Sequence, residues 1–165
     1  MAITKLDGVP LMYQRTDGVC WYACSRMLYK WSSTTGRGSV RNPETADSGY
    51  VERYNSNGSV RAADNWHLAK AFNLVKQPSL TMDYENVYKF LLEHGPIWAG
   101  VKKVWGGNHG HVIVICGVAE TGVFVHDPEP VKQGSTYWLT WSQIRQGVED
   151  LHKETTPDPQ FLSAV

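Results

Sequence analysis

The 165-residue chain has few of the features that would assign it to a special class of protein. Its three cysteines are too few and too irregularly spaced for a disulfide framework, so we expect free thiols in a reducing environment. No hydrophobic run is long enough to cross a membrane, and the first residues lack the apolar core of a signal peptide. Lys and Arg total 16, as do Asp and Glu, so there is no basic excess for nucleic acid. We therefore expect a soluble protein with no nucleic-acid partner and no membrane partner.

Large apolar side chains are plentiful. Hydrophobic residues make up 42% of the chain and aromatic residues 12%, with seven tryptophans. This composition is enough to bury a core, and flat aromatic side chains also suit a groove that binds peptides. The length favours a single domain over residues 1–165.

The periodicity of the apolar residues changes along the chain. It predicts helices first, at 20–31, 60–74 and 84–94, and then strands at 97–104, 111–118, 122–127 and 135–141. This order indicates an α+β fold with an antiparallel sheet. Between the first two helices, residues 32–60 are rich in Ser, Thr, Gly and Asn and are expected to form a flexible loop. The C-terminal tail, residues 149–165, is expected to be loosely structured.

Cys20 stands at the head of the first predicted helix, within "YQRTDGVCWYACSRML". A thiol in the first turn lies in the field of unpaired N–H groups and of the positive end of the helix dipole. That field favours the nucleophilic thiolate. Cys20 is therefore the candidate nucleophile, although a cysteine at this position could also be a small buried hydrophobic residue.

His111 and Asp127 are the candidate partners of this thiol. His111 opens the most apolar predicted strand, "HVIVICGV", and Asp127 closes the next one. Because a short turn joins two antiparallel strands here, the start of the first lies beside the end of the second. The hairpin thus predicts that a histidine and a carboxylate meet, as nucleophilic catalysis by a thiol requires.

Other residues have weaker claims to this site. Gln14 carries an amide that can donate to an oxyanion. The candidates for lining the cleft are Trp21, Gly110 and Trp105. Cys24 lies one helical turn after Cys20, so it is expected in the core, with a small chance of being the nucleophile instead.

A zinc site is the main alternative use of the histidines. His109 and His111 form a His-x-His pair that would need His126 or Asp127 as a third ligand. No spaced set of Cys and His supports such a site, so we expect no metal. Cys116, in the middle of a strand, is expected in the core.

Taken together, Gln14, Cys20-Trp21, Gly110-His111 and Asp127-Pro128 resemble the papain-like cysteine peptidases. The stretch that runs from "LLEHGPIWAGV" through "GHVIVICGV" to "VFVHDP" is similar to the short bacterial branches, the AvrRpt2-like effector proteases and the C39-like peptidases. The likeness covers a core of about residues 10–145.

The resemblance implies a papain-like fold, with the central helix that carries the nucleophile packed on an antiparallel sheet. It implies an endopeptidase with a Cys20–His111–Asp127 triad, a Gln14 oxyanion hole, a protein substrate and no cofactor. It also implies secretion or delivery within a larger protein, as an effector or toxin active in the cytoplasm of a target cell. A cognate immunity protein that blocks the active site would then be a partner.

Two other functions are possible on this fold. A cysteine-dependent amidase, deamidase or transglutaminase-like enzyme would use the same order of Cys, His and acid. A non-enzymatic C39-like binding module would lack the nucleophile, and Cys20 argues against that interpretation.

Overall fold

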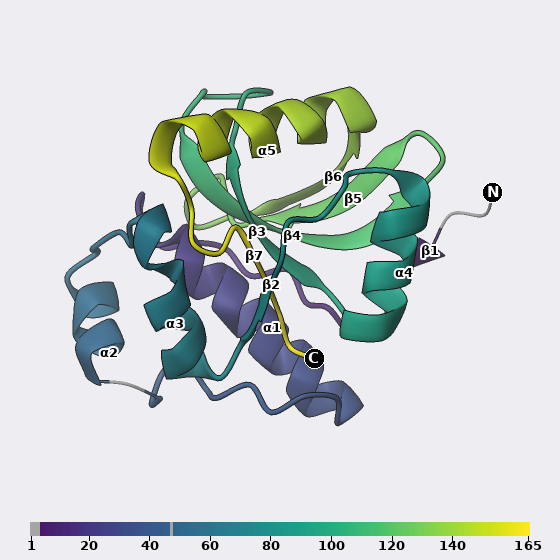
Figure 1. Ribbon diagram of the computed structural model, residues 1–165. Coiled ribbons are helices and arrows are strands. Elements are labelled where there is room, and N and C mark those ends of the chain that lie inside the picture. Colours follow the sequence, from purple (N-terminus) through teal and green to yellow (C-terminus); the bar gives the residue numbers. More distant parts are fainter. Residues whose placement is uncertain (1–3, 47) are drawn as a thin grey trace.

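A seven-stranded antiparallel sheet forms the centre of the protein in a computed structural model, which describes residues 4–46 and 48–165 (Figure 1). The strands are β1 (Thr4–Lys5), β2 (Val75–Gln77), β3 (Ile97–Lys102), β4 (Gly110–Ala119), β5 (Gly122–Asp127), β6 (Ser135–Thr140) and β7 (Phe161–Ser163). They are ordered β2-β7-β3-β4-β5-β6, and β1 pairs with part of β4. Residues 1–3 of the expected domain and residue 47 of the expected loop lie outside the described residues.

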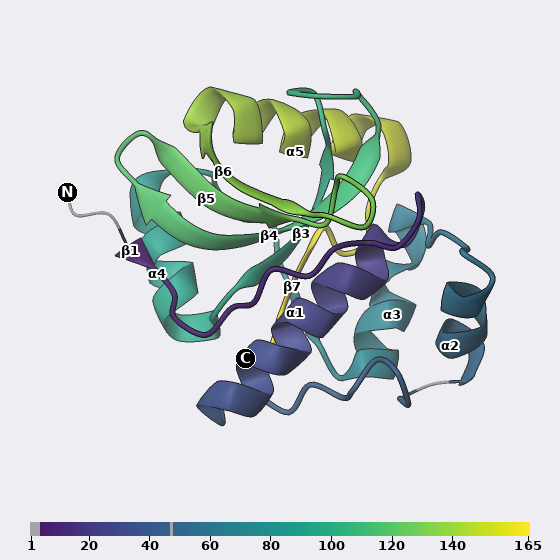
Figure 2. The same cartoon turned by 180° about the vertical axis from the view of Figure 1, so that it is seen from behind.

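The helices cover both faces of this sheet (Figures 1 and 2). They are α1 (Cys20–Thr35), α2 (Ser48–Asn55), α3 (Asn65–Phe72), which follows a short 3-10 helix (Ala62–Asp64), α4 (Tyr84–His94) and α5 (Trp141–Thr155). One hydrophobic cluster joins α1 and α3 to one face of the sheet, and a second joins α4 and α5 to the other face. No helix in the described part of the chain has the length and apolar character needed to span a membrane.

The apolar run in β4 follows from burial on both faces. Val112 and Val114 pack in the cluster with α1, whereas Ile113 and Ile115 pack in the cluster with α4 and α5. Because successive side chains of a strand point to opposite faces, a strand between two helical layers needs apolar residues at every position.

A two-residue turn joins β4 to β5 and fixes their register. Ala119 pairs with Gly122, and Val114 pairs with His126 farther along the ladder. Cys116 is an extra residue at a bulge between these two pairs. The beginning of β4 therefore lies beside the end of β5.

The α+β fold, the antiparallel sheet and the helix that starts at Cys20 are confirmed. That helix continues beyond the predicted end, to Thr35. It stops at Gly36, whose φ of 70° is left-handed and whose N–H donates to the carbonyl of Ser32. Glycine adopts this conformation without the steric penalty of a Cβ atom.

Two expectations about irregular segments are wrong. The loop expected at 32–60 contains the end of α1 and all of α2. The tail expected at 149–165 contains the second half of α5 and the strand β7, which lies inside the sheet between β2 and β3. Phe161 and Leu162 are buried there, so this short segment is held by tertiary packing rather than by a periodic sequence pattern.

Candidate active site

Cys20 is the first residue of α1, and its side chain is partly exposed. Gly18, two residues earlier, has a φ of 88° and turns the chain into the helix. No side chain caps this helix N-terminus, and its first turn contains no acidic residue. The positive end of the helix dipole is therefore not offset by a carboxylate in that turn, and Cys20 lies within its field.

His111 lies between Cys20 and Asp127. Its Nε2 atom is 2.7 Å from Oδ1 of Asp127, and its side chain also forms a hydrogen bond with Cys20. Because Nε2 faces the carboxylate, Nδ1 is the ring nitrogen that remains for the thiol. Cys20 and His111 are 91 positions apart in the sequence, and His111 and Asp127 are 16 positions apart. In the structure the three side chains lie next to one another, in the order Cys, His, Asp.

Asp127 is completely buried at the end of β5, where it accepts several hydrogen bonds. Besides His111, the hydroxyl of Tyr137 donates to Oδ2 at 2.6 Å, and Nζ of Lys103 lies 2.9 Å from the same oxygen. The backbone N–H of Glu129 donates to Oδ1 at 2.9 Å. Burial alone would raise the pKa of Asp127, but the bonds from His111, Tyr137 and Lys103 outweigh it and hold this pKa below its usual range. The carboxylate therefore stays ionised.

The pKa of His111 moves in the opposite direction. Burial favours the neutral ring, but the sulfur of Cys20 and the hydrogen bond to Asp127 favour the charged ring and raise this pKa to about 10. His111 is therefore an imidazolium near neutral pH, held between a sulfur and a carboxylate.

A cavity of about 750 Å³ opens in front of these groups. Its lining residues include Cys20, Trp21 and Gln14, together with Gly110 and His111. Ala62, Trp98, Val112 and Leu151 add an apolar part, and Ser59 and Val60 border it at the end of the segment expected as a loop. An extended peptide could occupy such a cleft beside the thiol.

Gln14 reaches this cavity because its backbone is held next to the segment after β5. Its N–H donates to the carbonyl of Pro128 at 3.0 Å, and its own carbonyl accepts from Lys132 at 2.8 Å. In the side chain, Nε2 donates to the carbonyl of Thr16 at 3.1 Å. An amide nitrogen carries two hydrogens, so one N–H remains for a ligand.

A family model described as papain-like cysteine protease AvrRpt2 matches residues 4–143. The chain belongs to this family. The match spans Gln14, Cys20, His111 and Asp127, and it ends within α5. This AvrRpt2-family chain is accordingly a papain-like cysteine peptidase, a hydrolase that acts on protein. A search of curated proteins finds no match.

The other two thiols of this AvrRpt2-family peptidase are buried in the cluster that contains α1. Cys24 Sγ donates to the carbonyl of Val112 at 3.4 Å, and burial raises the pKa of Cys24 well above its ordinary value. Burial likewise raises the pKa of Cys116 to about 12. Both side chains are therefore protonated thiols without access to the cavity.

Of the three candidates for lining the cleft, Trp21 and Gly110 border this cavity, whereas Trp105 is not among the residues that line it. The indole N–H of Trp105 donates to the Tyr137 hydroxyl at 2.8 Å, so this residue lies behind Asp127. The half-buried Tyr137 hydroxyl, which donates to buried Asp127, offers the indole a polar partner. Trp21 borders the cavity, and its indole N–H donates to the carbonyl of Gly58.

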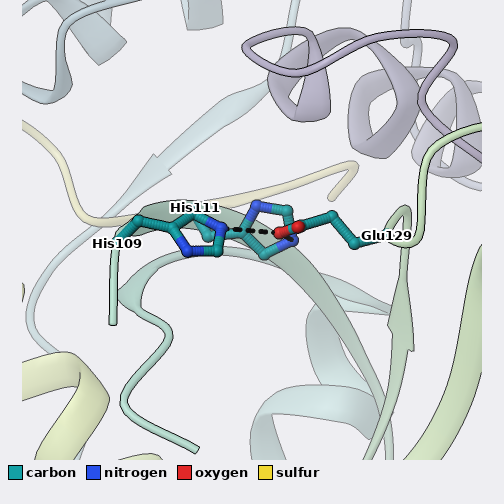
Figure 3. A group of neighbouring side chains, drawn as sticks. All are labelled: His109, His111 and Glu129. Carbon is teal, nitrogen blue, oxygen red and sulfur yellow. Dashed lines mark hydrogen bonds and ion pairs between the residues drawn. The ribbon is translucent and has the colours of Figure 1, made fainter. Parts of the chain in front are cut away.

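His109 and Glu129 extend this polar network, and Glu129 was not among the predicted site residues. Glu129 Oε1 lies 2.7 Å from Nε2 of His109 and 3.1 Å from Nε2 of His111, so both rings point toward one carboxylate (Figure 3). His126 is elsewhere, because its Nδ1 atom contacts the carbonyl of Pro10. The spacing of two residues between Asp127 and Glu129 was the available signal for this second carboxylate.

Proposed function

We propose that this peptidase hydrolyses peptide bonds within protein substrates through Cys20, His111 and Asp127. The observation that carries this assignment is that buried His111 forms hydrogen bonds with both Cys20 and Asp127 at the wall of a peptide-sized cavity. No other thiol among the described residues reaches a cavity beside a histidine.

Acylation starts from the thiolate–imidazolium pair. The Cys20 sulfur attacks the scissile carbonyl carbon, and the carbonyl oxygen becomes an oxyanion. The free N–H of Gln14 and the backbone N–H of Cys20 donate to this oxyanion. His111 then gives its Nδ1 proton to the leaving amine, the C–N bond breaks, and an acyl-enzyme remains.

Deacylation uses the same groups in reverse. Neutral His111 takes a proton from water, whose oxygen attacks the thioester, and the carboxylic acid product leaves as the thiolate forms again. Asp127 keeps Nε2 protonated throughout, so that Nδ1 stays directed at the reacting atoms.

Alkylation with iodoacetamide from about pH 4 to about pH 9 tests whether Cys20 and His111 form a thiolate–imidazolium pair. Mass spectrometry identifies which cysteine has reacted at each pH. We expect selective reaction at Cys20 in mildly acidic solution, and we expect this acidic reactivity to disappear in His111→Ala. His67→Ala, at an exposed histidine on α3, is the matched control and should react as the wild type does. First reaction at Cys24, or an unchanged profile in His111→Ala, would refute the triad.

The type of reaction is tested on a mixture of denatured proteins. New N-termini that appear with the wild type and not with Cys20→Ser support an endopeptidase. A mass gain of about one dalton without chain cleavage would indicate a deamidase instead, and cross-linked products would indicate a transglutaminase-like enzyme.

We also propose that the peptidase works as an effector or toxin inside another cell, a role supported by its membership of the AvrRpt2 family. A cognate immunity protein would then bind over the cavity and shield Cys20. Expression in the cytoplasm of a target cell should be harmful for the wild type and harmless for Cys20→Ser. Equal effects of the two chains would refute the role.

A further inference from the structure

Two histidines and one carboxylate converge on the side of His111 that faces away from Cys20. One ring nitrogen of His109, one ring nitrogen of His111 and a carboxylate oxygen of Glu129 all lie within 4.8 Å of one another (Figure 3). His109 immediately precedes β4 and His111 is the second residue of that strand, and the centroids of their rings are 5.4 Å apart. Glu129 comes from the segment just after β5, the hairpin partner of β4.

The donor set suits a divalent transition-metal cation. Two imidazole nitrogens and one carboxylate oxygen form a common set of protein ligands for Zn²⁺, with a fourth position for water. Nε2 of His109 forms a hydrogen bond with Oε1 of Glu129 at 2.7 Å, and Nε2 of His111 makes an ion-pair contact with the same oxygen at 3.1 Å. A cation bound among these atoms would replace both contacts.

Asp127 and Glu129 together carry two negative charges here. In the metal-free protein they face two positive groups, Lys103, whose Nζ lies 2.9 Å from Oδ2 of Asp127 and 3.8 Å from Oε1 of Glu129, and the imidazolium of His111. A cation that displaces the Nε2 proton of His111 would replace the positive charge that this proton carries.

We propose that His109, His111 and Glu129 form a binding site for a divalent transition-metal cation, Zn²⁺ above all, and that the bound cation reversibly inhibits the peptidase. The inhibitory half of this proposal rests on the proposed function of His111. The sequence alone predicted no metal site, because no spaced set of Cys and His supports one. The structure supplies Glu129 as the third ligand.

Inhibition follows from the proton balance of the ring. When the cation binds Nε2, the proton on that nitrogen is released and the hydrogen bond to Asp127 is broken. The ring keeps one N–H, at Nδ1, and can donate it to the leaving amine only by becoming an imidazolate. A neutral imidazole is a far weaker acid than an imidazolium, so acylation slows.

The ligand geometry separates this site from ordinary metal binding by an active-site thiol. Cys20 interacts with the other ring nitrogen of His111, so the thiol is not needed as a ligand. We therefore expect Cys20→Ser to retain the cation, whereas a Cys–His site would lose it. His109→Ala and Glu129→Gln each remove one ligand and should weaken binding at least about tenfold.

Co²⁺ titration of the whole chain, followed by its visible absorption, tests the site independently of activity. The expected result is saturable binding by the wild type and by Cys20→Ser, without a sulfur-to-cobalt charge-transfer band. His109→Ala and Glu129→Gln should bind weakly, and His67→Ala, the matched control on α3, should bind as the wild type does. Loss of binding in Cys20→Ser, full binding in His109→Ala, or no binding by the wild type would each overturn the site.

Peptidase assays with added Zn²⁺ test the inhibitory half. Zn²⁺ should lower the activity of the wild type, a chelator should restore it, and His109→Ala should need at least about tenfold more Zn²⁺ for the same inhibition. Co²⁺ binding with Zn²⁺-insensitive activity would overturn the inhibition and leave the metal site. A chain that binds Co²⁺ but cleaves nothing even after chelation would refute the proposed function and, with it, the inhibition.

Discussion

Tyr137 forms a hydrogen bond with the carboxylate of Asp127, and this carboxylate forms a hydrogen bond with His111. Its hydroxyl donates to Asp127 at 2.6 Å and accepts from the indole of Trp105 at 2.8 Å. Burial and the neighbouring carboxylate raise the pKa of Tyr137 above its ordinary range, so this hydroxyl remains a donor. Tyr137 is thus a positioning residue, which acts on the reaction through Asp127 and His111.

Tyr137→Phe removes this donor and leaves the Trp105 indole without its acceptor. We expect kcat to fall about tenfold with KM little changed, because the cleft keeps its shape while the ring of His111 loses orientation. The free energy of unfolding should fall by about 1–3 kcal/mol, since buried polar groups lose partners. Steady-state kinetics and urea unfolding measure both effects. Tyr88→Phe, on α4, is the matched control, and a kcat no lower than that of this control would contradict the role.

The raised pKa of His111 predicts the alkaline limit of activity. The imidazolium must be present for acylation, so kcat/KM should decline with a midpoint near pH 10 and not near the ordinary histidine value. In Asp127→Asn the negative charge that favours the imidazolium is gone, so the midpoint should move to lower pH. The pH profile of kcat/KM measures this, and an Asp127→Asn midpoint at or above that of the wild type would contradict the assigned cause.

Hairpin geometry was enough to predict that His111 and Asp127 meet, because a two-residue turn fixes the register between β4 and β5. The place of Tyr137 was not predictable in this way. Its strand follows the connection over residues 128–134, and the register after so long a loop depends on tertiary packing. The indole of Trp105, in the connection between β3 and β4, donates to Tyr137, so its position depends on the same packing.

At the scale of elements, β7 shows how a short C-terminal segment can complete a sheet. Leu162 is fully buried opposite Trp98 of β3, and Gly100 of the same strand donates to the carbonyl of Gln160. β3 contributes Trp98 and Gly100 to the cavity wall, so β7 supports the strand that shapes the cleft.

Leu162→Ala should lower the free energy of unfolding by about 2–5 kcal/mol, the usual cost of removing a large buried side chain. Urea unfolding followed by tryptophan fluorescence measures this change. Leu92→Ala is the matched control, because Leu92 is 52% exposed on α4 and should cost far less. Equal losses in the two variants would show that β7 does not belong to the cooperative core.

The sequence predicted α1, α4 and the strands β3 to β6, and it missed α2, α5 and β7. α4 has an amphipathic pattern, and its N-cap residue Asp83 accepts a hydrogen bond from the N–H of Asn86. The residues of this segment are therefore enough to predict where the helix begins and ends. α2 has only eight residues and depends on partners distant in sequence. Tyr54 stacks on Tyr22 of α1 with ring centroids 3.6 Å apart.

At the scale of the whole molecule, the three thiols differ in whether a reagent in solution can reach them. Cys20 faces the cavity from the end of α1, whereas Cys24 and Cys116 lie in the cluster between α1 and the sheet, 0% and 2% exposed. α1 contacts the sheet along its length, so the two buried thiols become accessible only when this helix separates from β4.

A thiol reagent should therefore label one cysteine in the native protein and all three in strong denaturant. In Cys20→Ser the native count should be zero and the denatured count two, since Cys24 and Cys116 remain. Because the second phase requires α1 to leave the sheet, its rate should rise with urea in step with global unfolding, and Leu162→Ala should accelerate it. Native labelling of Cys24 at a rate independent of urea would mean that α1 opens locally, without unfolding of the sheet.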